Sequence, residues 1–90
     1  MNQKQTPKQI EDKVRKEYLT DKYKALCEVE VETEYQIEYL ESEEGKKLNV
    51  DEAGEVSWEE TIKRAEKTLI KVRTNKQFIL NQIDADGNVS

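Results

Sequence analysis

Histidine is absent from this sequence of 90 residues, and cysteine, proline and tryptophan each occur once. Without histidine, the chain lacks the commonest general base and the commonest metal ligand. The single cysteine, Cys27, has no partner for an internal disulfide, which is typical of a reducing compartment. Apolar runs long enough for a membrane span or a signal-peptide core are also missing. These absences predict a cytoplasmic protein.

Charged residues dominate what is present. They make up 39% of the sequence, against 34% hydrophobic residues, and the net charge is −5. The charge balance is +3 over residues 1–26, −11 over 27–60 and +3 over 61–90. An acidic middle between mildly basic ends argues against nucleic-acid binding and favours a basic protein as the partner.

A chain of this length predicts one domain with a thin core. We assign residues 1–6 to a flexible N-terminus, 7–84 to a single α+β domain and 85–90 to a C-terminal tail. Because so little apolar material is available, sharing it between two copies would add stability. We therefore expect a homodimer.

Two helices are predicted. Thr6 as the N-cap and Pro7 at the first helical position begin a helix over 7–20. Ser57 and Glu60 match a capping box, which begins a second helix over about 58–72. Ending that helix near residue 67, with a strand over 68–73, is an alternative. Apolar residues recur at helical spacing in the second helix, at Trp58, Ile62, Ala65, Leu69 and Val72.

Residues 24–40 predict a long strand. Their odd positions are mostly apolar or β-branched and their even positions mostly glutamate, an alternation that gives a strand one buried face. A polar turn over 41–47 leads to a short return strand over 48–50, and 51–54 closes as a loop. A further strand is predicted over 77–83, followed by a turn over 84–88. The order α-β-β-α-β predicts an α+β fold, with a small antiparallel sheet of about three strands and two helices on one face.

Catalytic and metal sites are not expected. Cys27 lies on the apolar face of the predicted strand without a histidine to activate it. The three scattered glycines form no phosphate-binding loop. Residues 84–88 resemble a calcium loop only in part, because both end positions of the motif lack their ligand. A glycosidase needs one carboxyl group shielded from water and one that is ionised, whereas glutamates exposed along one strand would all have similar surroundings. We expect no enzyme, no cofactor and no metal.

The predicted strand would place a row of glutamates on its outer face, with more acidic residues in the turn that follows. Alternate residues on a strand lie about 6.7 Å apart, which is close to two axial steps of one DNA strand at about 3.4 Å each. This spacing predicts a DNA mimic that occupies the DNA-binding surface of a basic protein. The partner-binding residues would be Glu28, Glu30, Glu32, Glu34, Glu38, Glu41, Glu43, Glu44, Asp51, Glu52 and Glu55.

Other interpretations remain open. One alternative is an acidic face that serves only to keep the protein soluble, since charged residues commonly protect strand edges from aggregation. A generic protein-interaction adaptor, or a structural subunit that associates with itself, would also have this composition.

In its charge pattern over residues 27–60, its short length and its histidine-free, Lys/Glu-rich composition, the chain resembles the small acidic early proteins of lytic phages. Several of those proteins mimic DNA. The resemblance implies a role in host takeover, a location in the host cytoplasm, and a target such as an HU-type nucleoid-associated protein, RNA polymerase or a nuclease. No motif matches residue by residue, and the basic ends depart from the most acidic mimics.

Overall fold

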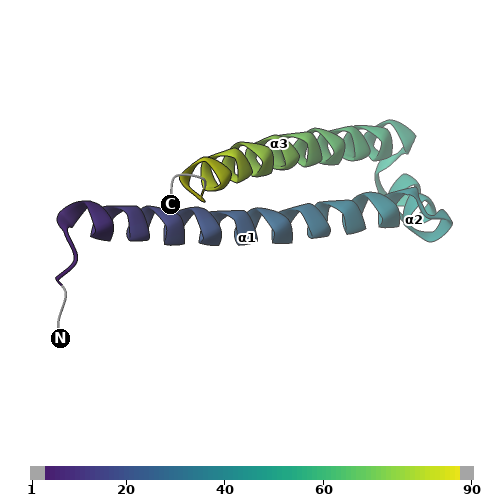
Figure 1. The fold of residues 1–90 in the computed structure, drawn as a ribbon. Helices are drawn as coiled ribbons and strands as arrows, with labels where there is room; N and C mark the ends of the chain where they lie inside the picture. Colours follow the sequence, from purple (N-terminus) through teal and green to yellow (C-terminus); the bar gives the residue numbers. More distant parts are fainter. Residues whose placement is uncertain (1–3, 88–90) are drawn as a thin grey trace.

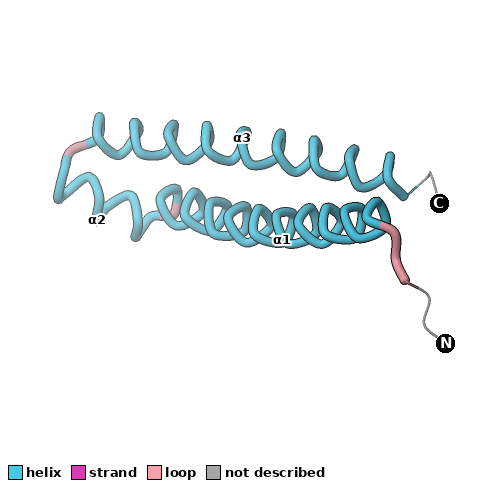
Figure 2. Tube along the Cα trace, turned by 90° about the vertical axis from the view of Figure 1, so that its left-hand side faces the viewer, coloured by secondary structure: helices cyan, strands magenta, loops and turns pink. Residues whose placement is uncertain are grey.

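A computed structural model describes residues 4–87, which form three helices (Figure 1). Helix α1 spans Pro7–Glu41, α2 spans Glu43–Ala53 and α3 spans Glu55–Gly87. Helices α1 and α3 lie side by side in opposite directions, and α2 joins them at one end (Figures 1 and 2). The resulting hairpin measures 68 × 22 × 16 Å. Its radius of gyration is 20.1 Å, whereas a compact domain of this length would have about 12 Å.

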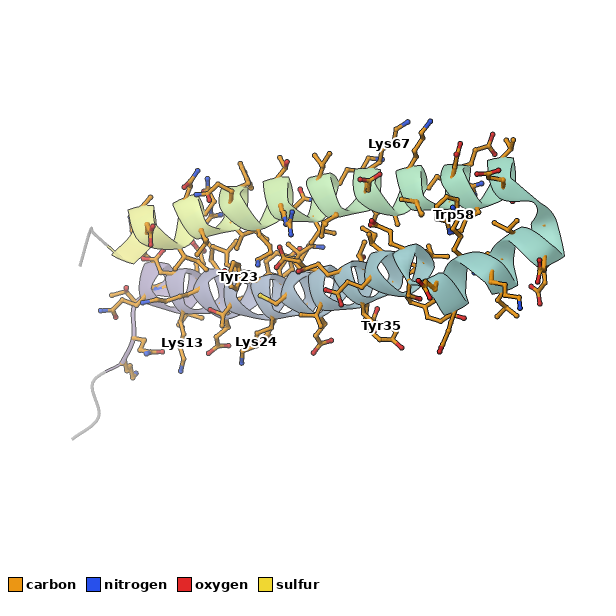
Figure 3. All side chains as sticks on the ribbon, turned by 90° about the vertical axis from the view of Figure 1, so that its right-hand side faces the viewer. Lys13, Tyr23, Lys24, Tyr35, Trp58 and Lys67 are labelled. Carbon is orange, nitrogen blue, oxygen red and sulfur yellow. The ribbon has the colours of Figure 1, made fainter. Side chains whose placement is uncertain are left out.

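The two long helices meet along one seam, in which residues recur at alternating spacings of four and three. This spacing is typical of helices that pack side by side over their whole length. Tyr23 and Trp58 point between the helices, while Tyr35 of α1 and Lys67 of α3 point away from the opposite helix (Figure 3). The seam residues, all buried or half-buried, are Leu19, Tyr23, Leu26, Glu30, Thr33, Ile37 and Leu40 of α1 and Trp58, Ile62, Ala65, Leu69, Val72, Lys76, Ile79 and Ile83 of α3.

The predicted α+β fold is wrong. Residues 4–87 contain no strand, so the three-stranded sheet and the order α-β-β-α-β do not exist. The predicted strand over 24–40 is the second half of α1. The return strand over 48–50 lies within α2, and the strand over 77–83 lies within α3, as does the alternative strand over 68–73.

The failure of the predicted long strand has a specific cause. The odd-position alternation over 24–40 placed Leu26 and Leu40 on the charged face, where neither residue fits. The four–three spacing instead places both leucines in the seam, with Leu40 only 4% exposed. Glutamate is a good helix former and a poor strand former, so the many glutamates favour the helix as well. The alternation arose by chance, and within residues 24–40 it coincides with the seam only at Thr33 and Ile37.

The predicted starts of the two helices had different outcomes. Thr6 is the N-cap of α1 and Pro7 its first residue, as predicted, and Gln9 completes a capping box with Thr6. The helix continues to Glu41, well past the predicted end at residue 20. Ser57, in contrast, lies inside α3, which already begins at Glu55. The predicted helix over 58–72 is therefore the first half of a longer one.

The chain reverses direction with very short interruptions. Ser42 separates α1 from α2 and Gly54 separates α2 from α3. Gly54 has a φ of 93° and a ψ of 160°, a conformation that is essentially confined to glycine. The predicted turn over 41–47 and loop over 51–54 thus shrink to these single residues, and Asp51 is helical.

The ends of the chain lie partly outside the described residues. Residues 1–3 of the predicted N-terminal segment and 88–90 of the predicted C-terminal tail are outside that range. The predicted turn over 84–88 is wrong for 84–87, which are helical. Across the described helices, none combines the length and the apolar character needed to cross a membrane.

Candidate interaction surfaces

A group of charged residues interrupts the apolar seam near the middle of α1. Glu30 accepts a hydrogen bond of 2.5 Å from Lys76 Nζ at one carboxylate oxygen, and one of 3.1 Å from Arg73 Nε at the other. Arg73 also lies 3.9 Å from Glu34. The ammonium group of Lys76 sits 5.4 Å from the centre of the Tyr23 ring, a favourable cation–π distance. This cluster joins the acidic part of α1 to the basic part of α3.

The hydrogen bonds in this cluster shift two pKa values in opposite directions. Lys76, and to a lesser extent Arg73, lowers the pKa of the Glu30 carboxyl group. The hydrogen bond to Glu30 raises the pKa of Lys76. Both shifts favour the charged forms, because each charge has its partner within hydrogen-bond distance. Glu30 and Lys76 side chains are 17% and 18% exposed, so the pair is part of the packed seam and not a surface contact.

The glutamates of the predicted row do not share one face. In a helix, residues two apart are rotated by about 200° and rise by about 3 Å, so the expected spacing of 6.7 Å is lost. Glu30 lies in the seam and Glu34 beside it, and both contact Arg73. The other three members, Glu28, Glu32 and Glu38, are exposed. The continuous carboxylate row, and with it the spacing argument for a DNA mimic, is therefore wrong.

The remaining predicted partner-binding residues do come together, at the closed end of the hairpin. We call residues 41–60 the tip; its charge balance is −6. Its only basic residues are Lys46 and Lys47, and Lys46 lies over the Trp58 ring at 4.7 Å. No ion pair holds a tip carboxylate within residues 4–87. The exposed acidic residues of the tip are Glu41, Glu43, Glu44, Asp51, Glu52, Glu55, Glu59 and Glu60.

Some of the tip carboxylates have a structural role. Glu43 and Glu44 lie in the first turn of α2, and Glu55 in the first turn of α3. Negative charge at a helix N-terminus is stabilising by about 0.3–1 kcal/mol at exposed positions. Glu41 has the opposite setting, because it ends α1, where the helix dipole is negative. The local folding of the helices thus explains three of the eight acidic residues and leaves five unexplained.

Trp58 and Gly45 hold the tip together. The indole Nε1 of Trp58 donates a hydrogen bond of 2.7 Å to the Leu40 carbonyl, which lies in the last turn of α1. Gly45 is buried where α2 crosses the end of α1, and a Cβ atom there would approach the Tyr39 carbonyl oxygen to 1.9 Å. These two contacts join the end of α1 to the starts of α2 and α3 at the tip.

The two broad sides of the hairpin differ in charge. Rows of residues seven apart flank the seam on each side. On one side, Arg15 Nη2 donates a hydrogen bond of 3.1 Å to Gln82, which places the rows of these two residues next to each other. We call this the Tyr18 side; its two rows are Arg15, Lys22, Val29 and Gln36 of α1 and Thr61, Thr68, Asn75 and Gln82 of α3.

On the opposite side, the Arg73–Glu34 contact joins the two flanking rows. We call this the Val31 side, because Val31 precedes Glu34 by three residues and lies next to it on the helix surface. Ile70 likewise precedes Arg73 by three residues and lies next to it on the surface of α3. The rows on this side are more strongly charged; they consist of Lys13, Thr20, Cys27, Glu34 and Glu41 of α1 and Glu59, Glu66, Arg73 and Leu80 of α3.

Exposed apolar side chains border both sides. On the Tyr18 side, Tyr18 is 63% exposed, Val29 39%, Tyr39 38% and Phe78 62%. These four residues were not predicted to form a surface, and the strand prediction placed Val29 and Tyr39 on a buried face. The seven-residue repeat was the signal that would have placed them outside the seam.

Comparison with known proteins does not assign this hairpin to a family: no family model, curated protein or solved structure matches the chain.

Proposed function

We propose that this chain is a non-enzymatic helical-hairpin subunit that acts by associating with itself, as a scaffold or adaptor for protein assembly. One observation carries the proposal. The chain exposes 7425 Å², whereas a compact monomer of 10.6 kDa would expose about 5,500 Å². The excess of about 2,000 Å² per chain is of the order that stable protein–protein interfaces bury in total.

The distribution of apolar side chains supports self-association. The buried hydrophobic residues of the hairpin are Leu19, Leu40, Ala65, Val72 and Ile79, and among the side chains that the structure describes none is fully buried. Two helices with a single seam leave the rest of each helix in water, so burial of apolar area is limited. Large hydrophobic residues that remain exposed are Ile10, Val14, Tyr18, Val29, Val31, Tyr35, Tyr39, Leu48, Val56, Ile70 and Phe78.

Sedimentation equilibrium over a concentration series tests the proposal directly. We expect the mass to rise from that of one chain at low concentration to a plateau at a small integer multiple. We also expect thermal unfolding, followed by circular dichroism, to shift to higher temperature as the protein concentration rises, because association stabilises only the folded form. A single-chain mass at every concentration, with a concentration-independent Tm, would refute self-association.

A second candidate function concerns the tip. Its net charge of −6 and its exposed carboxylates, which form no ion pair within the described part of the chain, favour a basic partner. This candidate keeps the partner class expected from the sequence but limits any DNA mimicry to residues 41–60. Exposed charge pairs each contribute at most about 1 kcal/mol, so affinity for such a partner has to come from the whole group of carboxylates.

Competition with DNA tests the second candidate. The probe is a purified HU-type protein bound to labelled duplex DNA, titrated with the chain at several salt concentrations. Displacement should weaken steeply as salt rises. A variant with Asp51→Lys, Glu52→Lys and Glu60→Lys should lose displacement. A matched variant with Glu11→Lys, Asp12→Lys and Glu17→Lys, at the other end of the hairpin, should retain it. Equal loss in both variants would mean that net charge alone matters, and no displacement by the natural chain would exclude this candidate for HU-type targets.

A further inference from the structure

The Tyr18 side is better suited to contact another protein than the Val31 side. Its central rows contain two charged residues, Arg15 and Lys22, and otherwise valine, threonine, asparagine and glutamine. The corresponding rows of the Val31 side contain Lys13, Glu34, Glu41, Glu59, Glu66 and Arg73. The buried centres of protein interfaces are depleted of charged residues and enriched in aromatic ones. Three aromatic residues, Tyr18, Tyr39 and Phe78, border the Tyr18 side and are partly or largely exposed.

We propose that a second copy of this chain docks on the Tyr18 side, so that two hairpins form an antiparallel four-helix bundle with their tips at opposite ends. The inference rests on the proposed function, self-association, and adds the contacting surface and the relative direction of the two copies. Four helices packed around a common centre bury a second face of each helix, which a lone hairpin leaves in water.

The direction follows from the charge distribution. The tip has a balance of −6, whereas residues 4–26 and 76–87, which make up the open end, together have +2. Two copies that point the same way would bring both acidic tips together, which is unfavourable because like charges repel. Two copies that point in opposite directions place each tip beside the open end of the other copy, where the charges attract.

The apolar residues of α1 fit the same arrangement. Val29 lies eleven residues after Tyr18 and ten before Tyr39, so it is close to the midpoint between them along the helix. A twofold axis that passes near Val29 would place Tyr18 of one copy close to Tyr39 of the other. It would also bring the two Val29 side chains near each other at the centre.

Matched substitutions on the two sides test the contacting surface. Phe78→Glu on the Tyr18 side is compared with Ile70→Glu on the Val31 side, because these two residues are 62% and 64% exposed on the same helix. Val29→Lys is compared likewise with Val31→Lys. We expect the substitutions on the Tyr18 side to raise the dimer dissociation constant at least about tenfold. The Val31-side variants should dimerise like the natural chain.

The helical content of every variant, measured by circular dichroism, separates loss of association from loss of folding. If a Tyr18-side variant loses its helices, Tyr18→Lys, at a residue that is 63% exposed, replaces it in the comparison. If the Val31-side variants dissociate and the Tyr18-side variants do not, the surface is wrong, although self-association stands. If the natural chain is itself monomeric, the proposed function fails first.

Disulfide cross-linking tests the direction. In a Cys27→Ser background, one chain carries Tyr18→Cys and another Tyr39→Cys. After mixing and mild oxidation, we expect cross-links between the two different chains and few within either population alone. Efficient cross-linking of Tyr18→Cys chains to each other would instead show parallel hairpins and overturn the antiparallel arrangement. Failure to cross-link in any combination, with dimerisation intact, would place the interface elsewhere.

Discussion

Lys76 Nζ of α3 lies 2.5 Å from Glu30 Oε1 of α1, at positions where the repeat of the seam otherwise places mainly apolar residues. Arg73 Nε donates to the second oxygen of the same carboxylate, so both oxygens of Glu30 accept a hydrogen bond. A buried or half-buried ion pair adds little net stability. Removal of one partner is nevertheless destabilising, because the charge of the other is left in the seam without an opposite charge. Polar residues in a helical seam also restrict the register in which the two helices pair.

We predict that Lys76→Met lowers the Tm of the hairpin, because Glu30 then loses its shortest hydrogen bond while remaining in the seam. The double variant Glu30→Leu with Lys76→Leu should unfold at a temperature equal to or above that of the natural chain, since leucines can pack where the pair was. Lys67→Met, at a residue that points away from the seam (Figure 3), is the control and should leave the Tm nearly unchanged. A double variant less stable than Lys76→Met would contradict the argument.

The same pair predicts how stability depends on pH. The pKa of Glu30 is lowered in the folded state, so its contribution is complete above its ordinary value of about 4.3 and is lost as the pH falls through the lower, folded-state pKa. The pKa of Lys76 is raised, so its contribution is complete below about 10.4 and is lost as the pH rises through the higher, folded-state pKa. Chemical denaturation across pH should therefore show a decline at each extreme. Glu30→Gln should reduce the acidic decline; an unchanged acidic decline would count against Glu30 as its source.

Trp58 should stabilise the tip through its indole N–H as well as through its ring. Trp58→Phe keeps an aromatic side chain but removes the donor to the Leu40 carbonyl, and we expect a loss of about 1 kcal/mol in unfolding free energy. Trp58→Ala should cost more, because the ring packs in the seam. Urea denaturation measures both values. Equal costs for the two variants would mean that the hydrogen bond, and not the ring, accounts for the whole effect.

Gly45 should not tolerate a side chain. In Gly45→Ala the new Cβ would meet the Tyr39 carbonyl oxygen at 1.9 Å, and backbone on both sides has to shift to relieve the contact. We expect a destabilisation of about 2 kcal/mol or more, together with partial opening of the α1–α2 corner. Trp58 fluorescence and thermal unfolding follow the two effects. Glu44→Ala, at the exposed neighbouring residue, is the control and should have a much smaller effect. A fully stable Gly45→Ala variant would show that α2 does not pack as described.

The sequence predicted those features of the helices that depend on residues close together in the chain. Thr6 and Pro7 predicted the start of α1, because capping uses only side chains and amides within one turn. The spacing from Trp58 to Val72 predicted a helix whose apolar residues face inward, and each of them is buried or half-buried in α3. Ser57 and Glu60 had the residue types of a capping box without being one, since the chain already enters the helix at Glu55.

Residues 24–40 could not be placed by the alternation that they contain. Both the two-residue period of a strand and the seven-residue repeat of paired helices fit this stretch, because the two patterns place some of the same residues inward. The neighbouring helix distinguishes the two periods: Leu26, Glu30 and Leu40, at even positions, face inward because α3 lies alongside α1. The glutamate row, and the DNA spacing derived from it, depended on the wrong choice between these periods.

By itself, the sequence determined the start of α1, the inward residues of the first half of α3 and the segregation of charge along the chain, because these properties depend on residues close together in the sequence. Only the tertiary structure decided that α1 is continuous, that Glu30 belongs to the seam with Lys76 and Arg73, and that residues 41–60 of the acidic middle form the tip. The reason is that a helical hairpin brings together residues that are far apart in the sequence, such as Arg15 and Gln82, which are 67 positions apart. Such contacts select one of several periods that the local pattern permits.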